Sequence, residues 1–175
     1  FFRDPATVLR ADKSFLLTVF GAVMMSIGFI ALYQQAGSFD FEVLKAYYQD
    51  NPLPAFAVWM ILLGILSKSA TLPLHTWLPD AGVAPTTVTA LLHAAVLVKI
   101  GVYAYARLFL YTFKLPGDWP QVIPVLVVIS SLVAAAAATV ETDFKRILAY
   151  STVSQIGYIF LGFSVANVAG VSGSL

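Results

Sequence analysis

The sequence predicts an all-α polytopic transmembrane helix bundle, and three observations carry this prediction. The 175 residues are 59% hydrophobic and 11% charged, whereas a soluble domain carries about 25% charged residues. The mean hydropathy is +0.85. Long apolar stretches alternate with short polar connections along the whole chain. The chain also lacks cysteine, which excludes disulfides, thiolate metal sites and iron–sulfur ligation, and we expect neither a metal nor a cofactor in it.

Five apolar stretches are expected to cross the membrane, one of them as a broken helix. A helix that rises 1.5 Å per residue needs about 20 residues to cross a hydrocarbon core of about 30 Å. The expected spans are 14–33, 56–79 (the broken one), 87–111, 122–140 and 147–169. They form one transmembrane domain over residues 1–175. Because the chain opens without a start methionine, we expect a fragment of a longer protein.

The polar segments and the glycines carry further expectations. Residues 1–13 are polar and are expected to form a loop or an interfacial turn. Residues 41–48 favour a short amphipathic helix at the interface, with two adjacent tyrosines as anchors. Gly21 and Gly28 lie on one stripe of the first span, where a neighbouring helix can approach closely; the alternative is small residues at a position that tolerates them.

Ionisable residues lie in the middle of two of the expected spans. Lys68 lies about twelve residues into the broken one, and a lysine at the centre of a transmembrane helix costs roughly 2.5–3.5 kcal/mol. Pro73 predicts the break because it lacks an N–H group and its ring clashes with the carbonyl of Ser69. Such a break is tolerated at membrane depth where protein or water satisfies the freed backbone groups. This combination indicates ion movement rather than anchoring.

Lys68, His93 and Lys99 together form the candidate proton relay. A buried lysine can take up and release protons, and histidine titrates near neutral pH. The alternative for Lys68 is a structural ion pair with a carboxylate on another helix. None of the expected spans contains an Asp or Glu, so that carboxylate would have to lie outside this sequence.

Secondary candidates lie at the ends of the spans. His75 follows the break near the interface, and Asp80 is expected at a helix end, where it can simply cap a turn. Asp143 and Lys145 lie at the mouth of a helix hairpin, where we prefer a solvated, salt-bridged loop. Nucleotide-binding glycine loops and metalloprotease motifs are absent from the sequence. The net charge is +1 without a basic run, so no nucleic-acid partner is expected.

The distribution of lysine and arginine predicts an orientation. Five spans place residues 1–13, 80–86 and 141–146 on one side of the membrane. That side holds Arg3, Arg10, Lys13, Lys145 and Arg146, and the other holds Lys45, Lys114 and Arg107. By the positive-inside rule, the N-terminal segment is expected in the cytoplasm.

Two stretches resemble a known family. They read KSATLPLHTWLPDAGVAPTTVTALLHAAVLVKIGVYAYARL and TDFKRILAYSTVSQIGYIFLG. Both are similar to the antiporter-like membrane subunits of respiratory complex I, Mrp-type sodium/proton antiporters and membrane-bound hydrogenases. The resemblance covers most of the chain. It implies a multi-pass protein in the inner (plasma) membrane of a bacterium or archaeon, with lipid and other membrane subunits as partners.

The resemblance also implies an architecture and roles for individual residues. It implies a bundle of about fourteen helices built from inverted repeats with a broken helix in each, and this chain would be its middle. Lys68 matches the family's proton-carrying lysine, and His93 and Lys99 match positions of the connecting relay. In the family, the lysine that Lys68 matches pairs with a glutamate on the preceding helix. That helix is not part of this sequence.

Three functions are therefore considered. The first is a non-redox subunit that translocates protons or sodium within a redox-driven or antiporter complex. The second is a haem-binding membrane anchor that uses His75 and His93 as axial ligands. The third is a stand-alone secondary transporter, since broken helices are common there too. The two intramembrane lysines favour the first.

Overall fold

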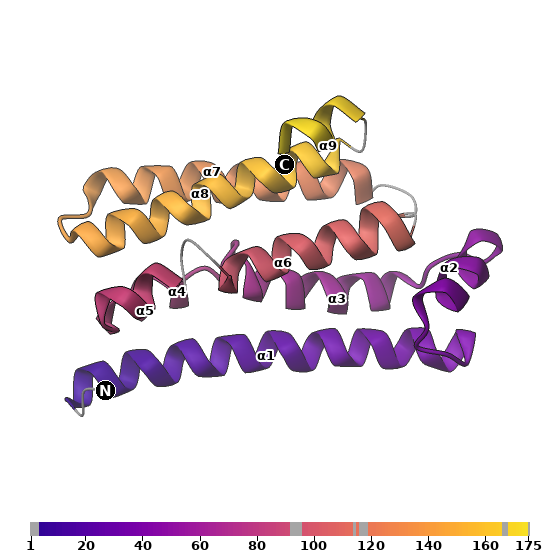
Figure 1. The fold of residues 1–175 in the computed structure, drawn as a ribbon, viewed down its shortest axis with the longest axis horizontal. Coiled ribbons are helices and arrows are strands. Elements are labelled where there is room, and N and C mark those ends of the chain that lie inside the picture. Colours follow the sequence, from indigo (N-terminus) through magenta and orange to yellow (C-terminus); the bar gives the residue numbers. More distant parts are fainter. Residues whose placement is uncertain (1–3, 92–95, 114, 116–118, 166–167, 175) are drawn as a thin grey trace.

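The computed structural model describes residues 4–91, 96–113, 115, 119–165 and 168–174. All regular secondary structure in these residues is helical, which confirms the all-α class. Figure 1 shows the long helices running side by side along one axis, with α1 (Pro5–Ala36) at one edge and α7 (Trp119–Val140) and α8 (Phe144–Ser164) at the other. Between them lie α3 (Ala55–Lys68) and α6 (Leu97–Tyr105).

The glycine stripe of α1 packs against α3, as the sequence predicts. A side chain at Gly21 would overlap Ser67, and one at Gly28 would press on Ile61. The close approach lets the Ser67 hydroxyl donate a hydrogen bond to the Leu17 carbonyl over 2.7 Å. Small residues thus bring α1 near enough to α3 for contacts between a side chain and the opposite backbone.

Two helix boundaries differ from the sequence expectation. Residues 5–13 belong to α1 rather than to a loop, because Pro5 occupies the first helical position and neither proline nor glycine follows in this segment. At the other end of the chain, α8 stops at Ser164 rather than near 169. The short α9 (Val168–Ser174) then lies against α8.

The connection after α1 contains the expected interfacial helix, α2 (Phe41–Asp50), which Asp40 caps by accepting a hydrogen bond from the Glu42 amide over 2.9 Å. Tyr48 is buried, and its hydroxyl donates to Gln35 over 3.2 Å, so it holds α2 to α1 instead of anchoring in lipid. Burial, and secondarily Tyr47, raises the pKa of Tyr48.

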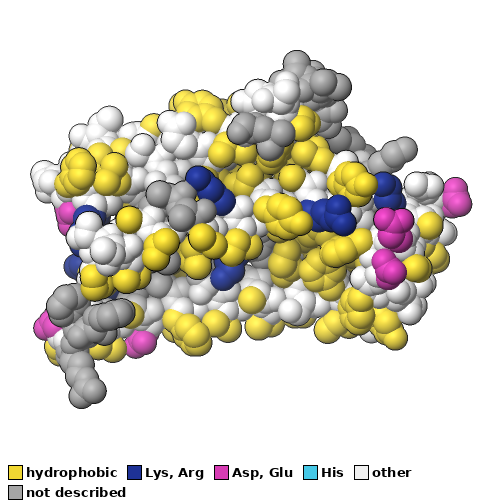
Figure 2. Space-filling view, viewed as in Figure 1, with side chains coloured by type: hydrophobic (Ala, Val, Ile, Leu, Met, Phe, Trp, Pro, Cys, Tyr) yellow, Lys and Arg dark blue, Asp and Glu magenta, His cyan; other side chains and the backbone are white. Residues whose placement is uncertain are grey.

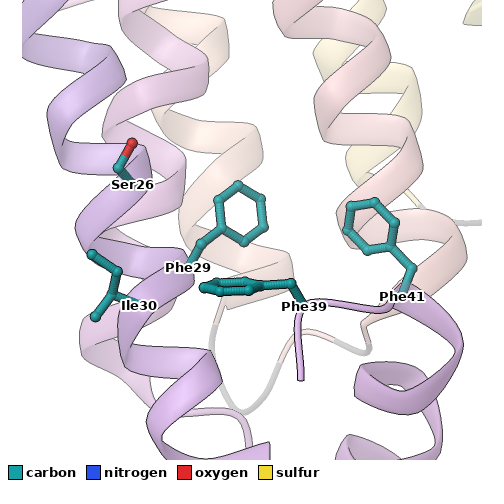
Figure 3. A pocket seen from close by; sticks show the side chains of 5 residues that line it. All are labelled: Ser26, Phe29, Ile30, Phe39 and Phe41. Atoms are coloured by element: carbon teal, nitrogen blue, oxygen red, sulfur yellow. The ribbon is translucent and has the colours of Figure 1, made fainter. Parts of the chain in front are cut away.

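An aromatic hollow of about 390 Å³ lies where α1 meets the start of α2. Figure 3 shows Phe29 and Phe41 facing each other across it, with Phe39 below them. Ser26 and Ile30 complete the lining, so the hollow contains no ionisable side chain. Its composition is typical of the aromatic belt at a membrane interface.

The expected helix over 87–111 is divided in the structure. It contains α5 (Thr86–Ala90), α6 and a π-helical segment, η3 (Ala106–Thr112). Three described helices are long and apolar enough to cross a membrane, namely α1, residues 121–140 of α7, and α8. With 14 residues, α3 covers only about 21 Å of a core about 30 Å thick. It is therefore too short to cross such a core as one continuous helix.

Candidate functional site

The last turn of α3 closes on itself and ends the helix at Lys68. The Thr71 amide donates to the Leu66 carbonyl over 2.9 Å, and the Ala70 amide donates to the Ser67 carbonyl over 3.3 Å. Ala70 has φ of 50°, in the left-handed region. These bonds form a Schellman motif, which satisfies carbonyl groups that a helix end leaves free.

The position of the break corrects the expected role of Pro73. The helix already ends at Lys68, so a clash between the Pro73 ring and the Ser69 carbonyl does not cause the break. Pro73 lies within the non-helical segment 69–76, and helical structure resumes in α4 (Trp77–Asp80). Sequence reasoning missed the true end because a left-handed helix cap is usually glycine, and here it is alanine.

Trp77 closes the break from its far side. Its side chain is 2% exposed, and its indole Nε1–H donates to the Ser67 carbonyl over 2.9 Å. The Trp77 carbonyl in turn accepts from the Ser14 hydroxyl of α1 over 3.2 Å. The backbone on both sides of the break is therefore connected, and α1 is bonded to the second side.

Polar atoms in the break are buried without hydrogen-bond partners. The Ser69 and Thr71 hydroxyls belong to residues with no exposed surface, and the His75 Nδ1 atom is also buried. Buried polar groups are normally paired with protein or with ordered water. The segment next to Lys68 thus offers hydrogen-bonding groups that nothing in the described chain uses. His75, expected near the interface, belongs to this segment.

Lys68 is half-buried and is the last residue of α3, where the partial negative charge of the helix C-terminus favours a cation. It forms no ion pair with any described carboxylate. Figure 2 shows Lys and Arg side chains in the middle of the visible face, whereas Asp and Glu are seen only toward its two ends.

The structure describes Lys99 but not His93. Lys99 is exposed on α6 and also lacks an ion pair among the described residues. It lies two residues before Gly101, whose backbone packs on Ser69, so α6 runs beside the break. His93 lies outside the described residues. No described contact joins Lys68 to Lys99, and their proposed relay stays a prediction.

A cluster of charges, which we call the ionic end, joins α1, α4 and α8. Asp80, with 15% of its side chain exposed, pairs with Lys13 Nζ at 2.6 Å and with Arg146 at 3.5 Å. Arg146 also pairs with Glu141 at 3.2 Å. Asp80 was expected to cap a turn, but its carboxylate instead connects three helices.

The hairpin mouth is salt-bridged through Arg146 and Glu141, but Asp143 and Lys145 do not form an ion pair with each other. Asp143 caps α8 by accepting from the Lys145 amide over 2.9 Å. The Lys145 ammonium donates to the Gly82 and Ala84 carbonyls over 3.2 and 3.0 Å. Its partner is therefore the turn η1 (Ala81–Val83) and not Asp143. These contacts confirm that the start of α1, the 80–86 turn and the 141–146 loop share one end of the bundle.

The family described as "NADH:quinone oxidoreductase/Mrp antiporter, TM" matches residues 1–175. The chain belongs to this family of antiporter-like membrane subunits. It is 42% identical to NADH-quinone oxidoreductase subunit L of Escherichia coli (strain K12), over 94% of this chain and 28% of that protein. It is 39% identical to Na(+)/H(+) antiporter subunit A1 of Staphylococcus haemolyticus (strain JCSC1435), over 95% of this chain and 21% of that protein.

Solved structures of the family share this fold. In the structure of the Mrp complex from Dietzia sp. DQ12-45-1b, one chain is similar over 99% of this chain and 19% of its own length, with a TM-score of 0.90 and 28% identity. In the membrane-bound sulfane sulfur reductase, an archaeal respiratory membrane complex, the TM-score is also 0.90, at 27% identity, over 99% of this chain and 37% of the matched chain.

The chain spans about a quarter of the length of the curated relatives named above, 28% and 21%. Within the part that the structure describes, no group of three or more His, Asp or Glu side chains is arranged to hold a metal ion. Near the break, Lys68 and Lys99 form no ion pair with another described residue.

Proposed function

We propose that this chain is the central part of an antiporter-like subunit that translocates protons or sodium within a multi-subunit membrane complex. One observation carries the proposal: Lys68 ends a helix that is too short to cross a membrane, forms no ion pair with any described carboxylate, and lies beside buried polar atoms without described partners. An unpaired lysine inside a membrane is costly and marks an ion path by default. Several relatives are subunits of quinone oxidoreductases or antiporters, which supports the same function.

In this proposal, the ion path passes from Lys68 to His93 and on to Lys99 of α6. Ser69 and Thr71 provide hydroxyls that can hold water beside Lys68. Helices of the longer chain cover the face on which Lys99 is exposed, because a lysine facing lipid would cost several kcal/mol. One of these helices provides the carboxylate for Lys68, and we expect a glutamate in the apolar helix that precedes residue 1. The larger bundle repeats this arrangement in inverted form.

The proposed orientation places the ionic end in the cytoplasm, because that end collects more lysine and arginine than the opposite one. A haem anchor is not favoured, since neither the family nor the relatives named above point to haem. A stand-alone transporter is not favoured either, because two solved relatives belong to multi-subunit complexes.

The test compares two lysines of this chain in the full-length subunit, assembled in its complex. Lys68→Ala should abolish proton and sodium uptake into inverted vesicles, while the complex stays assembled. Lys145→Ala is the control, because its ammonium bonds only to turn carbonyls at the ionic end, and it should retain most of the uptake. Uptake at the wild-type rate in the Lys68→Ala variant would show that the assignment is wrong.

A further inference from the structure

Ser130 of α7 accepts a hydrogen bond from a backbone amide of the break, and among the described residues no other side chain from another helix does so. Its side chain has no exposed surface, and its hydroxyl oxygen accepts from the Leu72 amide over 3.0 Å. Leu72 directly follows Thr71, whose hydroxyl is buried and unpaired. The contact therefore lies in the segment that follows Lys68.

Four other amides of the break find partners within α3 or within the break itself. The Ser69, Ala70 and Thr71 amides donate to the last turn of α3, and the Leu74 amide donates to Thr71. Pro73 has no amide hydrogen. Among residues 69–74, Leu72 alone thus depends on another helix, and Ser130 decides where this part of the backbone is held.

The next residue along α7 has a different partner. Ser131 donates to the Ser154 carbonyl of α8 over 3.0 Å and does not contact the break through a hydrogen bond. Ser131 is also buried, so the two neighbouring serines match in chemistry, depth and helix. They differ in their hydrogen-bond partners, which are the break for Ser130 and α8 for Ser131.

From this geometry we infer that Ser130 is a positioning residue for Lys68. It fixes the backbone of the break, and through it the place of the ammonium group at the end of α3. Without the hydroxyl, the part-buried Leu72 amide would lose its acceptor, and the break would rearrange to find another. Such a rearrangement would change the surroundings of Lys68. The inference rests on the proposed role of Lys68 in ion transport.

The experiment uses Ser130→Thr and Ser130→Val in the full-length subunit within its complex. Threonine and valine have nearly the same shape, but only threonine keeps the accepting oxygen. Ser131→Ala is the control on the same helix. Hydrogen–deuterium exchange of peptides that cover residues 69–76 reports the break directly, and the pH profile of ion uptake reports the surroundings of Lys68.

Ser130→Val should lower uptake roughly fivefold, as expected for one lost hydrogen bond. It should also shift the pH profile and speed exchange in residues 69–76. Ser130→Thr and Ser131→Ala should keep the wild-type profile and exchange. The inference is overturned if the threonine and valine variants behave alike in both readouts, or if valine only prevents assembly. Loss of uptake in Lys68→Ala with no effect of Ser130→Val would overturn this inference and leave the proposed function standing.

Discussion

The break after α3 and the ionic end both contain basic side chains, but these side chains are paired at the ionic end and have no ion pair with a described residue at the break. At the ionic end, Lys13 and Arg146 pair with Asp80, and Lys145 donates to backbone carbonyls. At the break, Lys68 has no ion pair among the described residues, and the hydroxyls beside it are unpaired. The cations of the ionic end hold helices together, whereas the cation of the break has no such partner among the described residues.

Magnitudes support this distinction. An exposed ion pair contributes about 0.2–1 kcal/mol, so the ion pairs of the ionic end stabilise the helix packing only modestly. A lysine held at membrane depth instead costs roughly 2.5–3.5 kcal/mol. A cost of that size, with no structural partner to offset it, is expected where the residue serves function.

The largest predicted effect comes from replacing a lysine by arginine, which keeps the positive charge, at the break rather than at the ionic end. Lys68→Arg should reduce ion uptake nearly as far as Lys68→Ala, because an arginine stays protonated and cannot cycle. Lys13→Arg at the ionic end should remain close to wild type, since an arginine still pairs with Asp80. Uptake in vesicles measures both. A Lys68→Arg variant that transports normally would mean that only a fixed positive charge is needed there.

The next effect concerns the rest of the proposed relay. Lys99→Ala should slow uptake strongly, and His93→Ala should slow it less than Lys68→Ala, because water can replace a relay imidazole but not a charge-bearing lysine. Single-turnover proton uptake at several pH values measures the difference. If neither variant changes the rate, the ion path does not follow α6, and Lys68 acts without these two residues.

A smaller effect is expected from Asp80→Asn, which removes the carboxylate shared by Lys13 and Arg146. We expect a loss of about 1 kcal/mol in stability, with ion uptake largely kept. Thermal denaturation of the complex at low salt measures the loss, and at about 1 M salt screening should shrink it. A large loss of uptake with unchanged stability would instead make Asp80 part of the ion path.

The smallest effect is expected from Ala70→Gly. Ala70 has φ of 50°, which costs a residue with a Cβ atom about 1–2 kcal/mol. Glycine relieves that cost but gains freedom in the unfolded chain, so the net stabilisation should be at most about 1 kcal/mol. Ala57→Gly, in the regular part of α3, is the control and should destabilise by about 0.5–1 kcal/mol. Equal destabilisation by both changes, seen as equal shifts of the thermal midpoint, would show that Ala70 is not strained.

Features that depend on local composition were predictable from the sequence. The apolar stretches predicted α1, α7 and α8 because a membrane segment must be both apolar and long. Gly21 and Gly28 predicted the face that packs on α3, since their spacing alone places them on one stripe. Lys68 was found as a candidate because a lysine within an apolar run is costly wherever the chain folds.

Features that depend on distant partners were decided by tertiary structure. The sequence offered Pro73 as the cause of the break, but α3 ends at Lys68, where Ala70 adopts a left-handed conformation and Trp77 bonds back to Ser67. Asp80 and Lys13 are 67 residues apart in the sequence, so no local pattern indicates that they pair. Hydrophobicity acts on each segment separately and can be read along the chain, whereas hydrogen bonds and ion pairs need two groups that only the packed helices bring together.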